Sequence, residues 1–177
     1  MPARGLLLLT VFSTAALAVL IGLGLWQLQR LQWKEGLIAE IETRVKAEPV
    51  SLKEAVARAH AGEDVSYLHV RAEGKFDNAK ERYFFAVSDG TPGWHVITPL
   101  ETSDGETVLV DRGFVPDALK DPAARPQGEL NDAVTVTALA RPPETQGLFV
   151  PDNEVERNRW FWRDLNAMTR SVFGNGA

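Results

Sequence analysis

The sequence predicts an α+β protein: an N-terminal transmembrane helix, then a small antiparallel β domain that is partly closed and barrel-like, with short flanking helices. Two observations support this prediction. Near its start the chain has a long apolar run, with no charge between residues 5 and 29. From residue 67 onward apolar residues recur at every second position, which is typical of half-buried strands. The 177 residues allow one anchor and one compact domain.

Residues 5–28 are predicted to cross a membrane. A helix needs about 20 apolar residues for this, and residues 6–26 are almost wholly Leu, Ala, Val, Ile and Gly. The alternative is a signal peptide cleaved at the small-x-small site of residues 16–18. The apolar run continues past that site to Trp26, whereas the hydrophobic region of a signal peptide is shorter. We therefore expect an anchor.

The flanking charges do not fix the orientation of this helix. Only Arg4 and the terminal amine precede it, and more Lys and Arg residues follow it, so a positive-inside count would place the head in the cytoplasm. The N-terminal tail carries too little charge, however, for this count to decide the orientation. The sequence alone leaves the sidedness open.

Trp26, Arg30 and Trp33 are separated by four and then three residues, so they share one face of a continuous helix. One interpretation is an interfacial aromatic belt with a snorkelling cation. The other is a docking surface for another membrane protein at the level of the lipid headgroups. Both interpretations fit the spacing.

Helical spacing of apolar residues predicts that the helix continues as an amphipathic stalk, residues 29–50, as far as Pro49. Ser51 is then expected to cap a second short helix, with Glu54 as its partner in a capping box. Gly62 should end that helix. The β-rich head is expected to occupy residues 51–177.

Five strands are predicted in the head, at residues 68–72, 82–87, 94–100, 107–115 and 134–140. Two of the turns between them share the tripeptide Ser-Asp-Gly, at residues 88–90 and 103–105, which favours hairpins and an antiparallel sheet. The segment 116–128 contains three prolines and is expected to be a surface loop. Residues 164–173 are predicted to form a short helix.

The sequence carries little that indicates chemistry. It has no cysteine, which excludes disulfides, thiol nucleophiles and covalent haem attachment. Hydrolase, phosphate-loop and metalloprotease motifs are also missing, so we expect no catalytic residue, no metal site and no enzymatic activity. The net charge is −5 and the basic residues are scattered, so nucleic acid is not an expected partner.

Three residues of the head are candidates for a functional role. His95 follows Trp94 beside a turn and is either a structural histidine or a functional one. Arg112 lies in an apolar strand; it either points inward to a carboxylate or points outward beside a β-bulge at Gly113. Trp160 shares one face of an extended segment with Trp162, and that face is either core packing or an apolar patch for a porphyrin or partner.

Several short motifs follow one another in a fixed order along most of the chain. They are Gly-Leu-Trp-Gln-Leu-Gln-Arg at residues 24–30, Trp33-Lys34, Leu37-Ile38, Gly93-Trp94, Thr98-Pro99-Leu100, Leu-Val-Asp-Arg-Gly-Phe-Val-Pro at 109–116, Phe-Val-Pro-Asp-Asn at 149–153, Asn158, Trp160, Arg163-Asp164 and Met168. Each is weak alone, but their order and spacing resemble the surfeit-locus-1 family.

The resemblance implies a membrane-anchored assembly factor for haem-copper cytochrome c oxidase that assists haem a insertion into subunit I. The alternative is a scaffold that stabilises subunit I without binding haem. The partners it implies are subunit I, haem A synthase and the membrane. It also implies a bacterial inner membrane, with residues 1–4 in the cytoplasm and the head in the periplasm.

The resemblance also selects residues. Those expected to contact a partner are Trp26, Arg30, Trp33, Arg112 and Trp160. The resemblance identifies no haem-binding residue, and His95 is the candidate contact for haem a only from its own sequence context. Similar members continue into further strands and a second membrane helix, which carries a histidine proposed as the haem ligand, and that role transfers to no residue here. We expect either a fragment whose β domain is incomplete at its C-terminal end or a member that works without that ligand.

Overall fold

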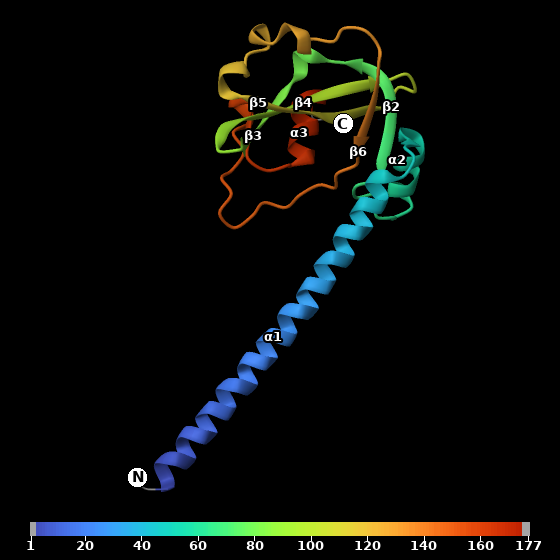
Figure 1. Cartoon of the computed structure of the whole chain (residues 1–177). Helices are drawn as coiled ribbons and strands as arrows, with labels where there is room; N and C mark the ends of the chain where they lie inside the picture. The colour runs from blue at the N-terminus through green and yellow to red at the C-terminus, as the bar shows by residue number, and fades with distance from the viewer. Residues whose placement is uncertain (1–2, 175–177) are drawn as a thin grey trace. The chain divides into compact units, whose positions relative to one another are not determined.

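The structure, a computed structural model, describes residues 3–174 of the chain (Figure 1). The chain divides into two compact units, Met1–Ala47 and Glu48–Ala177. The expected cytoplasmic segment 1–4 lies partly outside the described residues, as does the C-terminal end of the chain from residue 175. We describe each unit by itself.

The first unit is one helix, α1 (Ala3–Lys46). It is continuous from the predicted anchor through the predicted stalk, and it ends three residues before Pro49, which cannot continue a helix. Within residues 3–174, it is the one helix long and apolar enough to cross a membrane, with a mean hydropathy of 2.5 in its most apolar window. Its last turns carry exposed ion pairs between residues four apart, Arg44 with Glu40 and Lys46 with Glu42.

The second unit starts with β1 (Val50–Ser51) and α2 (Leu52–His60). Ser51 caps α2 as predicted, since its Oγ accepts from the Glu54 N–H at 3.2 Å. The second half of the expected capping box is different: the Glu54 carboxylate pairs with Arg58, one turn further along the helix. Gly62, with a φ of +80°, lies just after the helix end, as predicted.

The five predicted strands are all present. They are β2 (His69–Phe76), β3 (Arg82–Ser88), β4 (Thr91–Thr102), β5 (Thr107–Pro116) and β6 (Val134–Leu139). Among themselves they pair only in the antiparallel sense. Two more strands of two residues each, β1 and β7 (Arg159–Trp160), pair parallel to β2 and β3, so the sheet is mixed and has seven strands.

Both Ser-Asp-Gly turns join hairpins, as predicted. In the β3–β4 hairpin, Ser88 pairs with Thr91, and the two residues between them, Asp89 and Gly90, have φ values of 48° and 77°. Positive φ at both positions matches the twist of the flanking strands. The β4–β5 hairpin has a different turn, in which the Thr102 N–H donates to the Glu106 carbonyl at 2.8 Å and Gly105 alone has a positive φ, of 82°.

β4 is the centre of the sheet. β5 runs along one edge of it, whereas β3 and then β2 follow each other along the opposite edge. The end of β2, from Gly74 to Phe76, pairs with β4, whereas the part from His69 to Gly74 pairs with β6, so the sheet bends without closing. Gly93 allows β5 to come close, since a Cβ there would lie 2.3 Å from the Val115 carbonyl oxygen.

The core lies against β4 and under the last helix. Most residues of β4 from Gly93 to Leu100 are buried, and α3 (Leu165–Phe173) adds Met168 and Val172. Asp164 caps α3 through the Ala167 N–H at 2.9 Å. Arg82 of β3 donates to the Ser171 hydroxyl at 2.8 Å and so fixes α3 to the sheet.

The predicted surface loop after β5 has local structure of its own. It contains three short 3₁₀ turns, η2 (Asp117–Leu119), η3 (Pro122–Ala124) and η4 (Pro126–Gly128), and two of them begin at a proline. The other 3₁₀ turns are η1 (Asn78–Lys80) and η5 (Val155–Arg157). Thus the segment returns to the sheet along an ordered path.

Candidate functional site

The three candidate residues of α1 lie on one face of the helix, as their spacing predicts. The Arg30 guanidinium carbon is 5.5 Å from the centroid of the Trp26 ring, which is a cation–π contact. Trp33 is 66 % exposed and Trp26 is 48 % exposed in this unit. The arrangement suits an interfacial anchor and a docking surface equally well.

Arg112 combines the two interpretations that its sequence context allowed. Arg112 and Gly113 lie together opposite the single residue Val96, which is the β-bulge, and Gly113 has a φ of +108°. The Arg112 side chain nevertheless points inward and is only 14 % exposed. It donates to Asn78 Oδ1 at 3.1 Å and stacks 4.5 Å from the centroid of the Phe76 ring.

The carboxylate that an inward arginine requires is Glu81, which is 4 % exposed. Glu81 forms a two-pronged ion pair with Arg125, and its Oε1 lies 3.7 Å from Arg112. Glu81 Oε2 also accepts a hydrogen bond from the Tyr83 hydroxyl at 3.0 Å. Two cations and a phenol thus surround one buried carboxylate.

These contacts shift two pKa values. Burial, followed by the charge and hydrogen bond of Glu81, raises the pKa of Tyr83 to about 12. Burial alone would lower the pKa of Arg125, but its hydrogen bond and ion pair with Glu81 outweigh burial and raise it. The site therefore holds its protons firmly and is poorly suited to proton transfer at neutral pH.

Trp160 belongs to the same internal structure. It is fully buried, and its indole Nε1 donates to Asn158 Oδ1 at 3.1 Å. Asn158, in the left-handed region with a φ of 52°, donates to the Glu81 backbone carbonyl at 2.8 Å. The expected partner contact is therefore corrected for Trp160, because a side chain without exposed surface belongs to the core. We call Glu81, Tyr83, Arg112, Arg125 and Asn158 the Glu81 network.

His95 lies in a second cluster, on the same face of β4 as its cross-strand neighbours Phe84 and Phe114. Its Nδ1 is 2.9 Å from Asp111 Oδ1, and its ring centroid is 6.3 Å from Phe84 and 6.1 Å from Phe114. Arg163 lies 3.8 Å from the other Asp111 oxygen. The side chain of His95 is 31 % exposed.

This geometry fits a haem ligand only in part. A carboxylate on Nδ1 orients an imidazole for ligation through Nε2, as in many metal-binding histidines. However, neither of the two cavities described below is lined by His95. The imidazole of His95 is therefore oriented, but it lies outside both of these cavities. Within residues 3–174, no group of three His, Asp or Glu side chains could hold a metal ion.

A cluster of cations and aromatic rings occupies the other face of the β3–β4 hairpin. The Lys120 ammonium lies 3.7 Å from the centroid of the Trp94 ring, and the Arg159 guanidinium carbon lies 5.8 Å from it. Trp94 Nε1 donates to Asp117 Oδ1 at 2.7 Å. Burial and the neighbouring charge of Arg159 lower the pKa of Lys120. These contacts hold the loop after β5 against the sheet.

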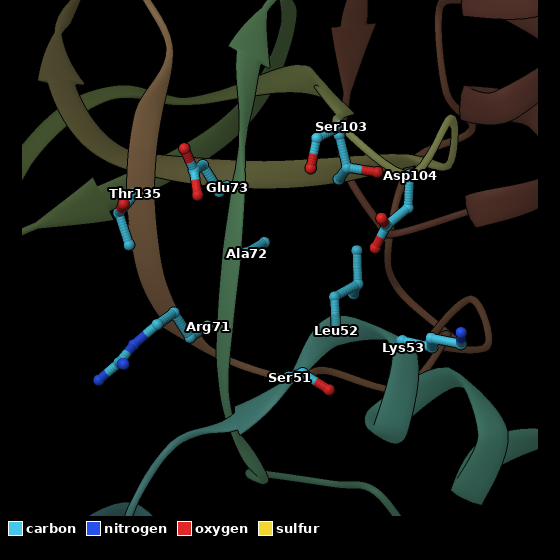
Figure 2. Close-up of a pocket in the computed structure, with 10 residues that line it drawn as sticks. Ser51, Leu52, Lys53, Arg71, Ala72, Glu73, Ser103, Asp104 and Thr135 are labelled. Carbon is cyan, nitrogen blue, oxygen red and sulfur yellow. The ribbon is translucent and has the colours of Figure 1, made fainter.

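Two cavities open on the surface of the head. The first, of about 460 Å³, lies between β2, β6, the start of α2 and the β4–β5 turn (Figure 2). Figure 2 shows Leu52 and Asp104 pointing toward each other on one side of β2, whereas Arg71 extends to the other side. The polar groups that line this first cavity do not converge on one point, as they do in ligand sites. The second cavity, of about 420 Å³, is lined by residues 143–146, Trp162 and residues 164–166.

Glu81 and Arg125, which organise the network, were not among the sequence candidates. A single Glu before a strand and a single Arg in a proline-rich loop are both typical of solvated surface positions. Glu81 and Arg125 are 44 residues apart in sequence, so no local pattern links them. The predicted need of Arg112 for a carboxylate was the one signal that pointed toward Glu81.

Comparison with known proteins gives the context of these clusters. Residues 14–176 match the SURF1 family model. The chain is 40 % identical over 166 residues to surfeit locus protein 1 of Homo sapiens, a match covering 84 % of this chain and 54 % of that protein. It is 39 % identical to surfeit locus protein 1 of Mus musculus, covering 86 % and 54 %, and 38 % identical to a SURF1-like protein of Monosiga brevicollis, covering 85 % and 61 %.

The chain thus spans about half the length of the curated mammalian relatives that it matches (54 % of each). The match runs through both units, from the apolar part of α1 to the end of α3. It includes the positions that build the Glu81 network and the His95 cluster. On this match, the chain belongs to the SURF1 family.

Proposed function

We propose that this chain is a membrane-anchored assembly factor for haem-copper cytochrome c oxidase. Its membership of the SURF1 family carries this proposal. The Glu81 network is an internal ion-pair cluster that holds loops and strands of the head together. Helix α1, long and apolar enough to cross a membrane, would keep the head beside a membrane-embedded client.

The more specific step that we propose is assistance to haem a insertion into subunit I, with haem A synthase as a further partner. The oriented imidazole of His95 is the observation in favour of a transient contact with haem. The alternative is a scaffold that stabilises subunit I and does not touch haem. It is favoured by the position of His95 outside both cavities described above. The proposed location is a bacterial inner membrane, with the head on the periplasmic side.

Deleting the gene in its host tests the proposal and separates the two alternatives. Reduced-minus-oxidised spectra of membranes report haem a, and immunodetection reports subunit I. If subunit I persists while the haem a signal falls, the lost step is cofactor insertion. If both fall together, the scaffold is the better description. If neither the haem a signal nor the amount of subunit I changes, the result contradicts a role in oxidase assembly.

A second experiment tests whether the α1 face contacts the client. Replacing Trp26, Arg30 and Trp33 together by alanine should reduce the recovery of subunit I with the tagged full-length chain. A matched control replaces Leu28, Gln32 and Glu35, which lie on the opposite face of the helix. Equal recovery with both triple variants would exclude this face as the docking surface.

A further inference from the structure

The loop between β6 and β7 presents two large apolar side chains to solvent. Leu148 is 97 % exposed and Phe149 is 98 % exposed. Among the other large apolar residues described in the head, the most exposed is Val87, at 61 %. Burial of apolar surface drives folding and association, so two adjacent side chains with almost no protein contact need an explanation.

The turn that carries them is held in shape. The Val150 N–H donates to the Gly147 carbonyl at 3.1 Å. The Gln146 side chain donates to the Val150 carbonyl and to Asp152 Oδ1, each at 2.9 Å. The exposed pair is therefore displayed by a hydrogen-bonded turn, and several polar groups at the base of the turn already have partners within the protein.

The composition of the loop suits an apolar, weakly hydrated environment. Residues 145–151 carry no charge, so moving them out of water would desolvate no ion. Three prolines flank or close the turn, Pro142, Pro143 and Pro151, and they have no backbone N–H that would need a partner. The nearest charges, Glu144 and Asp152, are acidic, so the loop lacks the basic groups that would draw it to anionic headgroups.

We propose that the Leu148–Phe149 turn inserts into the headgroup region of the lipid bilayer in which α1 is anchored. A bilayer is the occupant that the chain itself suggests, because α1 is long and apolar enough to cross one and would tether the head to its surface. Insertion at interfacial depth, about 5–10 Å, needs only a few apolar side chains and leaves the acidic flanks in water. The insertion is driven by apolar burial, so neutral phospholipid is sufficient.

The absence of cysteine makes the test direct. A single cysteine is introduced into the full-length chain as Phe149→Cys and labelled with a polarity-sensitive fluorophore, and the protein is reconstituted into phosphatidylcholine vesicles. Val87→Cys, on the sheet, is the water-exposed control, and Leu17→Cys, within α1, is the lipid control. The label at 149 should show a blue shift and loss of emission with lipid-borne nitroxide, whereas the label at 87 should show neither.

Each of the other outcomes overturns the inference in a different way. If the label at 149 behaves like that at 87 while the label at 17 is quenched, the anchor is sound and the turn lies in water. If the label at 149 is blue-shifted but not quenched by lipid nitroxide, a protein surface such as a second copy covers it. If the label at 17 is not quenched, α1 is not in the bilayer and the premise fails.

Discussion

At the scale of single residues, Glu81 connects several segments of the head. Its carboxylate has almost no exposed surface and faces two arginines from different segments. It also accepts a hydrogen bond from the Tyr83 hydroxyl. Such a pair contributes little net energy when intact, because desolvation offsets the attraction of the charges. Removing one charge, however, leaves the others buried without a partner.

Glu81→Gln should therefore destabilise the head by about 3–5 kcal/mol, the cost typical of an uncompensated buried charge. Denaturant unfolding followed by tryptophan fluorescence measures the effect. The matched control is Glu101→Gln, on an exposed position of β4, which should change the free energy of unfolding by less than about 0.5 kcal/mol. Equal effects from both variants would show that the network does not stabilise the fold.

Tyr83 gives a pH-dependent prediction at the same scale. Its pKa rises from 10.0 to about 12 in the folded protein, so the folded state keeps a proton that the unfolded chain loses. Its contribution to stability is present below about pH 10 and is lost as the pH rises toward 12. Between pH 9 and 12, the free energy of unfolding should fall more steeply with pH for the native chain than for Tyr83→Phe. The same pH dependence in both proteins would show that burial does not shift the pKa of the Tyr83 hydroxyl.

Residue-level prediction from the sequence succeeded where one position had only a few physical options. Arg112 in an apolar strand required either a bulge or a buried carboxylate, and the structure has both. His95 was selected without its partner, because Asp111 lies on another strand, and pairing across strands is not visible in a linear pattern. The same reason explains why Glu81 was missed and why the sequence could not choose between core packing and a surface patch for Trp160.

At the scale of elements, length decides what the sequence can predict. The five long strands and the three helices show clear periods or caps and were all predicted, whereas β1 and β7, with two residues each, are too short to show a period. Their parallel pairing depends on where other segments bring them. The capping box of α2 formed only in part, because Arg58 competes for the Glu54 carboxylate.

The Ser51 cap of α2 can be tested in isolation. Ser51→Ala should reduce the free energy of unfolding by about 1 kcal/mol, because the Glu54 N–H loses its acceptor. Ser51→Asp keeps an acceptor in place and should retain most of the stability. Thermal unfolding of the two variants measures the difference, and identical melting temperatures would show that the cap is not formed in solution.

At the scale of the whole molecule, the two units have separate sources of stability. Helix α1 is stabilised by its own backbone hydrogen bonds, whereas the head has its own core around β4 and α3. Residues 48–177 produced without α1 should therefore fold cooperatively. Circular dichroism and a single thermal transition would verify this, and a molten head would show that it depends on α1 or on further protein.

The Glu81 network also bears on how the head opens. The side chain of Glu81, just before β3, binds Arg125, 44 residues away, and the Glu81 backbone carbonyl accepts from Asn158, 77 residues away. A loop tied down in this way cannot detach without exposing buried charge, so its amide protons should exchange with solvent at the rate of the sheet. Although the proline-rich segment after β5 lies at the surface, we expect it to open as slowly as the strands of the sheet.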